Sequence, residues 1–184
     1  IITIFSIFLT PVFAFQPQTK AELQTAVDMW VDDNATALAT YGHISGWDVS
    51  LITDMNGLFF DESWNGFYDS FNDDIGGWDV SNVTSMHELF RDVESFNQDL
   101  SNWDVSSVTD MSFMFFGCFA FNQDLSSWDV YSVTDMNHMF GYAYVFNGDI
   151  SSWDVSNVTN MSALFQGSNF NGDISSWDVS SVTT

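Results

Sequence analysis

The chain has 184 residues, enough for one domain of ordinary size, and 46% of them are apolar, which predicts a substantial core. Lys and Arg number 2 against 25 for Asp and Glu, which gives a net charge of −23. Because nucleic acids and anionic lipid surfaces are bound by clustered cations, this balance argues against both as partners.

The first 14 residues, IITIFSIFLTPVFA, form a short apolar run that ends in Val12-Phe13-Ala14. This is the pattern of a secretory signal peptide, with cleavage expected after Ala14, and it is shorter than the roughly 20 apolar residues of a membrane span. The chain lacks an initiating Met and a basic start, so it is expected to begin inside the signal. The alternative is a buried N-terminal segment. The signal peptide predicts a secreted or cell-surface protein.

Residues 15–42 are predicted to form an N-terminal helical cap. Thr19-Lys20-Ala21-Glu22 fits a capping box, and an apolar stripe at helical spacing follows it. A second helix is predicted over Ala35 to Tyr41, ending at Gly42. Terminal repeats must shield an open core, which is the role expected of these helices. The stripe consists of Leu23, Ala26, Val27, Trp30 and Val31.

Residues 43–184 are periodic, with about five repeats of 24–31 residues. A period in the twenties is typical of a solenoid with one coil per repeat. The recurring Trp residues are Trp47, Trp78, Trp103, Trp128, Trp153 and Trp177, separated by 31, 25, 25, 25 and 24 residues.

Within a coil, the spacing from Ile150 through Trp153, Val155 and Val158 to Met161 fits the template of leucine-rich repeats. Alternation across Trp153-Asp154-Val155 predicts a short strand with Trp and Val buried, and Met161 to Phe165 suits one helical turn. The expected fold class is therefore α/β: a right-handed leucine-rich-repeat solenoid with short parallel strands and an N-terminal helical cap. In that frame the Trp column belongs to the core rather than to a sugar-stacking surface.

The repeated wording resembles a known family. Trp-Asp-Val-Ser-x-Val-Thr-x-Met-x-x-Met-Phe, followed by Phe-Asn-x-Asp-Ile/Leu-Ser-x-Trp, is similar to the BspA-type leucine-rich repeat, also described as the DUF285 or mycoplasma-lipoprotein-type repeat. The resemblance covers about residues 41–184. It implies secreted or surface-displayed proteins, several of them implicated in adhesion, without enzymatic activity in the repeat. The chain stops within a coil, so a longer natural protein with a C-terminal cap is expected.

An Asp follows Trp in every coil, and this column should project from the outer face. Like charges about 6 Å apart repel by roughly 0.7 kcal/mol even at the dielectric of water, so the column predicts weak recruitment of calcium. Duplication of the repeat without any function is the alternative. No other cofactor is expected. The candidate metal ligands are Asp79, Asp104, Asp129 and Asp154.

A further repeated pair of polar residues follows the Phe of the recurring Phe-Asn step in each coil. Asn and Asp recur there, as in Phe146-Asn147 with Asp149, and both suit a structural turn. The alternative is that this Asp column helps to bind cations.

Aromatic residues also lie in the segments whose length and sequence vary between coils. They are candidates for contact with an extracellular protein or glycan, although they could instead fold back onto the coils. The candidate partner-binding residues are Trp64, Tyr68, Tyr142 and Tyr144.

Conventional catalysis finds little support in the sequence. The three His residues occupy positions that do not pair across neighbouring coils, and no phosphate loop or H-E-x-x-H motif is present. The single cysteine, Cys118, allows neither an intrachain disulfide nor a cysteine-based zinc site. The expected function is a non-catalytic recognition or adhesion module. The alternative is a structural, calcium-bridged coat or wall component without a discrete partner.

Overall fold

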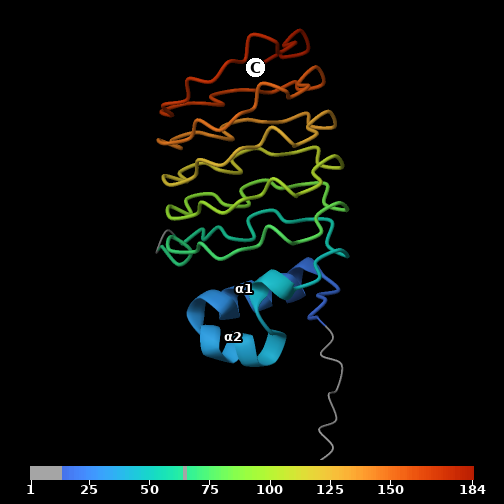
Figure 1. The fold of residues 1–184 in the computed structure, drawn as a ribbon, viewed down its shortest axis with the longest axis vertical. Coiled ribbons are helices and arrows are strands. Elements are labelled where there is room, and N and C mark those ends of the chain that lie inside the picture. The colour runs from blue at the N-terminus through green and yellow to red at the C-terminus, as the bar shows by residue number, and fades with distance from the viewer. Residues whose placement is uncertain (1–13, 64–65) are drawn as a thin grey trace, which may run out of the picture.

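The computed structural model describes residues 14–63 and 66–184. Helix α1 spans Lys20–Asp32, helix α2 spans Asn34–Tyr41, and the 3₁₀ helix η1 spans Ile44–Gly46. A stack of coils follows, with the two α-helices at one end and the C-terminus at the other (Figure 1). The predicted signal peptide lies outside the described residues except for Ala14. None of the helices in the described part of the chain has the length and apolar character needed to cross a membrane.

Both predicted helices are confirmed, and α1 begins where the capping pattern placed it. The Thr19 hydroxyl oxygen accepts a hydrogen bond from the Glu22 amide at 3.2 Å. The Glu22 carboxylate accepts from the Gln18 amide, one residue before the cap, at 2.7 Å. Helix α2 ends at Tyr41, and Gly42 follows with φ of 75°, in the left-handed region that glycine favours.

Helix α1 packs on the first coils through its predicted apolar stripe, of which Leu23, Ala26, Val27 and Trp30 are buried. The Trp30 ring meets the Trp47 ring edge to face, with centroids 6.0 Å apart. The Trp30 indole N–H donates to the Asp73 carboxylate at 2.8 Å. The helical segment therefore covers the open end of the first coil and excludes water from its Trp.

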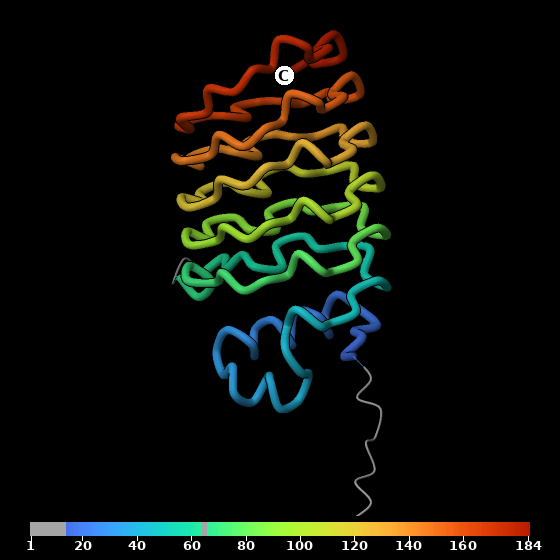
Figure 2. The backbone as a smooth tube through the Cα atoms, viewed as in Figure 1, coloured from blue at the N-terminus to red at the C-terminus, as the bar shows by residue number. Residues whose placement is uncertain are grey.

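The coils stack directly on one another along the long axis of the molecule (Figure 2). In each coil after the first, the Thr amide donates to the Thr carbonyl of the preceding coil at 2.8–2.9 Å, and the Thr hydroxyl donates to the same carbonyl at 3.1 Å. The Met two residues later donates its amide in the opposite direction, as from Met86 to the Asp110 carbonyl at 2.9 Å. Each coil is thus hydrogen-bonded to both neighbours. The Thr residues of this column are Thr53, Thr84, Thr109, Thr134, Thr159 and Thr183.

The Trp column forms part of the core, as predicted, and every indole N–H has a partner. Trp47, Trp78, Trp103, Trp128 and Trp153 are buried, and Trp177 is partly buried. The indole N–H of Trp128 donates to the Leu100 carbonyl at 2.9 Å, and the other Trp residues after Trp47 repeat this bond to the preceding coil at 2.9–3.2 Å. A buried indole N–H without an acceptor would be costly, so these bonds hold each Trp in register.

Two columns of Phe rings fill the rest of the core. Within one coil, Phe115 and Phe121 stack with centroids 4.0 Å apart. Between coils, Phe115 stacks on Phe90 and on Phe140, in each case at 5.7 Å. The core is therefore continuous along the stack, and no coil has a complete core of its own.

The predicted α/β fold, a leucine-rich-repeat solenoid with short parallel strands, is wrong. In residues 14–63 and 66–184, regular β structure is limited to isolated parallel bridges, and no strand forms. The helical turn predicted over Met161 to Phe165 is a non-helical turn. The bridges join Asp54 to Ser85, Ser85 to Asp110, Asp110 to Asp135, and Asp135 to Asn160.

Tight turns explain why strands do not form. The amide of Trp128 closes a turn onto the Leu125 carbonyl at 3.1 Å, and the amide of Val133 closes another onto the Val130 carbonyl at 2.9 Å. After each bridge the chain also takes left-handed φ values, as at Phe113 with 57° and at Gly117 with 71°. A strand needs φ near −120° over several residues, so these turns interrupt it. The same two positions have positive φ in neighbouring coils, at Glu88 and Asp92, and at His138 and Tyr142.

The Asn and Asp of the Phe-Asn step are structural, as predicted. The side-chain oxygen of Asn97 accepts from the amide of Asn122 in the next coil at 2.9 Å, and this bond recurs along the stack. Asp124 accepts from the Ser126 amide within its own coil at 2.8 Å. Side chains of this type satisfy turn amides and hold the turn at the same place in every coil.

We predict that Trp128→Ala destabilises the protein by about 3–5 kcal/mol, because it opens a cavity and removes the donor to Leu100. Trp128→Phe retains much of the packing and loses the donor, so it should cost less. Denaturant unfolding checks both variants, with Tyr131→Ala as the control because that side chain is 55% exposed. Equal losses for Trp128→Ala and Tyr131→Ala would contradict a structural role for the column.

Candidate functional site

The tips of four successive coils carry residues 25 apart that we call the loop-tip column: Asp69, Glu94, Phe119 and Tyr144. Backbone bonds next to these residues hold the tips together. The Ser95 amide donates to the Asp69 carbonyl at 2.9 Å, and the Ala120 amide donates to the Glu94 carbonyl at 3.0 Å. The column therefore forms one edge of the stack, acidic in two coils and aromatic in the next two.

The aromatic half of the column is exposed. Phe119 and Tyr144 are 36% and 45% exposed, and the adjacent Val145 is 50% exposed. The two rings stack with centroids 5.0 Å apart and an interplanar angle of 24°. Tyr142 is half-buried beside them and meets the Tyr144 ring edge to face at 6.3 Å. Exposed aromatic rings held in place by their neighbours are typical of recognition surfaces.

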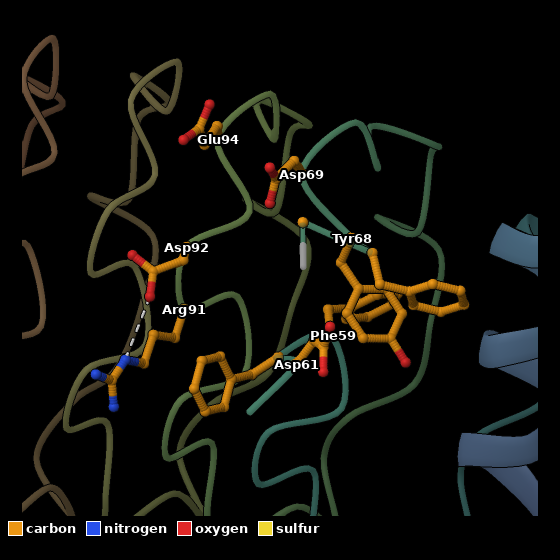
Figure 3. Close-up of a pocket in the computed structure, with 10 residues that line it drawn as sticks. Phe59, Asp61, Tyr68, Asp69, Arg91, Asp92 and Glu94 are labelled. Carbon is orange, nitrogen blue, oxygen red and sulfur yellow. Dashed lines mark ion pairs between the residues drawn. The ribbon is translucent and has the colours of Figure 1, made fainter. Parts of the chain in front are cut away.

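The acidic half of the column borders a cavity of about 190 Å³, which Figure 3 shows in close-up. Asp69, Asp92 and Glu94 lie to one side of this cavity, and the rings of Phe59 and Tyr68 lie to the other (Figure 3). Half-burial raises the pKa of the Asp92 carboxyl above its usual value, and the neighbouring Asp69 and Glu94 raise it further. Arg91 opposes this shift.

Arg91 is held in place by both charge and aromatic rings. It forms ion pairs with the carboxylates of Glu88 and Asp92, the latter at 3.4 Å. Its guanidinium lies over the rings of Phe60, Phe113 and Phe116, at 4.8, 5.1 and 5.4 Å from their centroids. Cation–π contacts of this kind supply about 0.5–1 kcal/mol each at partly exposed sites. Arg91 therefore ties three coils together beside the cavity.

The predicted partner-binding residues fall into different environments. Trp64 lies outside the described residues. Tyr68 is buried, and its hydroxyl donates to the Asp28 carboxylate of α1 and accepts from the Gln24 amide at 3.0 Å. Burial and the bond to Asp28 raise the pKa of Tyr68. Tyr68 therefore anchors the longest loop to α1, whereas Tyr142 and Tyr144 lie together at the accessible edge.

Sequence reasoning missed Phe119, Asp69 and Glu94, although one signal could have found them. All the residues of the loop-tip column stand two positions before the Phe of the Phe-Asn step, which is Phe71 in the first of these coils. Aligning the loops on that Phe, instead of comparing loops of different length as a whole, would have shown that these residues occupy the same position in each coil.

The predicted calcium ligands take part in turns within their own coils. One carboxylate oxygen of Asp104 accepts from the Ser106 amide at 3.1 Å and from its hydroxyl at 2.6 Å. Asp79 and Asp154 repeat both bonds, and Asp129 accepts from the Tyr131 amide at 3.1 Å. In the described residues, no group of three or more His, Cys, Asp and Glu side chains is placed to hold a metal ion. Calcium binding by this column stays a prediction.

One hydrogen-bonded chain contains the residue types of a hydrolase. Ser112 donates to Asp110 at 2.5 Å, and its hydroxyl lies 2.7 Å from the Nδ1 atom of His87. In a catalytic triad the His stands between the Ser and the Asp, whereas here the buried Ser stands between the other two.

The single cysteine, Cys118, is fully buried. Burial raises the pKa of its thiol and disfavours the reactive thiolate.

Comparison with known proteins gives one family. Residues 25–144 and 124–184 match a family model described as "Mycoplasma protein of unknown function, DUF285". Searches of the curated proteins and of the solved structures returned no match.

The Asp-Ser turns predict a local pH dependence. The Ser106 hydroxyl and amide hold the pKa of Asp104 below its usual value of 3.8, so the turn stabilises the folded protein above that pH and loses its contribution as the pH falls through the folded pKa. We expect Ser106→Ala to raise the pKa of Asp104 towards 3.8, as measured by NMR titration of the carboxyl carbon. Asp154, which has its own Ser156, is the internal control. An unchanged Asp104 pKa would contradict this assignment.

Proposed function

Because this chain belongs to the DUF285 family, we propose that its repeats are of the BspA type in sequence and form a secreted or cell-surface module that recognises proteins or glycans without catalysis. The observation that carries this proposal is the exposed, stacked pair of Phe119 and Tyr144. Burying such rings on a partner is favourable, and their stacking limits the side-chain entropy lost on binding.

The pattern of variation along the stack supports discrete recognition. The core columns keep the same residue types from coil to coil, whereas the loop-tip column reads Asp69, Glu94, Phe119 and Tyr144. A uniform lattice would be served by the same residue at every tip. Different residues at adjacent tips instead define one particular surface, as a specific partner requires.

The alternative is a calcium-bridged coat or wall component. The observation in its favour is the exposed column of Asp residues that follow Trp in each coil. In this column one carboxylate oxygen of Asp104 accepts hydrogen bonds from the amide and hydroxyl of Ser106. These carboxylates are exposed, and calcium accepts carboxylate oxygens in a flexible coordination geometry. In this case the column, rather than the loop tips, would be the functional surface.

We predict that replacing both Phe119 and Tyr144 by Ser weakens binding at least tenfold to whichever ligand a screen of extracellular proteins and glycans identifies. The matched control is Tyr131→Ser, because Tyr131 is the most exposed of the aromatic residues that the structure describes. Surface plasmon resonance measures the three affinities, and circular dichroism checks folding. Full binding by the double variant would contradict recognition through the loop tips.

For the alternative, we predict that calcium at a few millimolar raises the melting temperature by several degrees, since an ion bound only to the folded state stabilises it by mass action. Sodium chloride at matched ionic strength is the control for screening. The calcium-specific part of the shift should disappear when Asp104 and Asp129 are both replaced by Asn, which retains the turn acceptor. A shift no larger than that of sodium would remove the support for bridging by calcium.

A further inference from the structure

The loop-tip column combines an apolar surface with carboxylates on adjacent coils. Three large hydrophobic residues at this edge are exposed: Phe119, Tyr144 and Val145. The rings of Phe119 and Tyr144 stack on each other. Phe119 also follows directly on Glu94 in the column, because the Ala120 amide bonds to the Glu94 carbonyl. A partner that covers the rings therefore comes within reach of the carboxylates.

We propose that this edge docks a Lys- or Arg-rich segment of a partner protein, with its cationic side chains on the Phe119 and Tyr144 rings and beside Glu94 and Asp69. This inference rests on the proposed function, because it names the class of partner for the same surface. A guanidinium can stack with its flat face on an aromatic ring while its N–H groups, which lie in the guanidinium plane, pair with a carboxylate. A single Arg side chain can therefore contact both the aromatic half and the acidic half of the column.

The charge of the surrounding surface favours a cationic occupant. The cavity beside the column is lined by four carboxylates, Asp61, Asp69, Asp92 and Glu94, and by the single cation Arg91, so the side-chain charge there is 1 − 4 = −3. The guanidinium of Arg91 is engaged by Glu88 and Asp92 and by three Phe rings, which leaves Glu94 at the exposed tip. A segment carrying positive charge relieves this repulsion.

The same charges disfavour an acidic glycan. The whole chain carries −23, so an acidic polysaccharide would be repelled on approach, whereas a basic protein would be attracted and would associate faster. A neutral sugar could stack on the rings, but it would gain nothing from Glu94 and Asp69. The protein segment is therefore the occupant that uses every group at the edge.

The test uses the full chain and a labelled peptide in which Arg alternates with Gly and Leu. Fluorescence anisotropy should detect binding of this peptide and at least tenfold weaker binding of the isosteric, uncharged citrulline peptide. Replacing Asp69 by Asn and Glu94 by Gln together should weaken binding of the Arg peptide about tenfold, roughly threefold for each exposed ion pair. Raising the salt concentration from 0.05 to about 0.5 M should weaken it further.

The matched control removes two charges elsewhere. Asp149 and Asp173 are exposed and accept turn bonds from Ser151 and Ser175, which Asn can also accept. The Asp149→Asn, Asp173→Asn variant has the same net charge as the Asp69→Asn, Glu94→Gln variant. It should bind the Arg peptide as tightly as the parent protein. An equal loss in both variants would mean non-specific attraction to an acidic protein and would overturn the proposal.

Two further outcomes separate this inference from the proposed function. If the citrulline peptide binds as well as the Arg peptide, and Phe119→Ser with Tyr144→Ser abolishes both, the loop tips recognise partners but charge does not select them. If no peptide binds while a glycan binds through the same two rings, the occupant is a sugar. Either result overturns the cationic partner and leaves recognition through the loop tips standing. All six residues substituted in these variants are partly or fully exposed, and circular dichroism checks that each variant folds.

Discussion

The hydrogen bonds between coils are the constraint on which the rest of the structure depends. After each bridge, backbone amides alternate between closing a turn in their own coil and donating to the next coil: the Met114 amide bonds to the Met111 carbonyl, and the Phe115 amide bonds to Met139 of the following coil. A coil cannot slide without breaking the second set of bonds. The aromatic rings are therefore held 5.4–6.4 Å apart along their columns, and each position of the core must suit the same position in the neighbouring coils.

Much of this arrangement could be predicted from the sequence, because the apolar residues that form the core recur with the period of the coils. The spacing of Trp103, Trp128 and Trp153 identifies the coil, and its place in an apolar frame identifies the core. The capping pattern at Thr19 identifies the start of α1. The absence of strands from the described coils could not be predicted in the same way. Alternation of buried and exposed residues occurs in strands and also in this succession of turns, and left-handed φ values at Glu88, Phe113 and His138 have no signature in those residue types.

The candidate site was only partly accessible from the sequence, for a different reason. Tyr142 and Tyr144 could be assigned to a loop, and they do lie at the edge of the stack. Tyr68 has the same appearance in the sequence but is buried, because Asp28 and Gln24 of α1, 40 and 44 residues away, supply partners for its hydroxyl. A contact over such a separation depends on how α1 meets the first coil, and no local pattern encodes it. Exposure of a loop aromatic is therefore a property of the assembled stack.

The division between core columns and loop tips explains how one scaffold can carry a specific surface. Substitutions at exposed tips usually change stability by less than about 0.5 kcal/mol, so the residues there are free to vary while the Trp and Phe columns are not. Changes in length are absorbed as well. The coil from Trp47 to Trp78 exceeds the usual 25 residues by 31 − 25 = 6, yet Asp69 remains in register with Glu94, because the Ser95 amide still bonds to the Asp69 carbonyl. The extra residues are accommodated before the tip, between Phe60 and Asp69. Loop length can thus reshape the flank of the edge, including the cavity beside Arg91, without displacing the column that faces a partner.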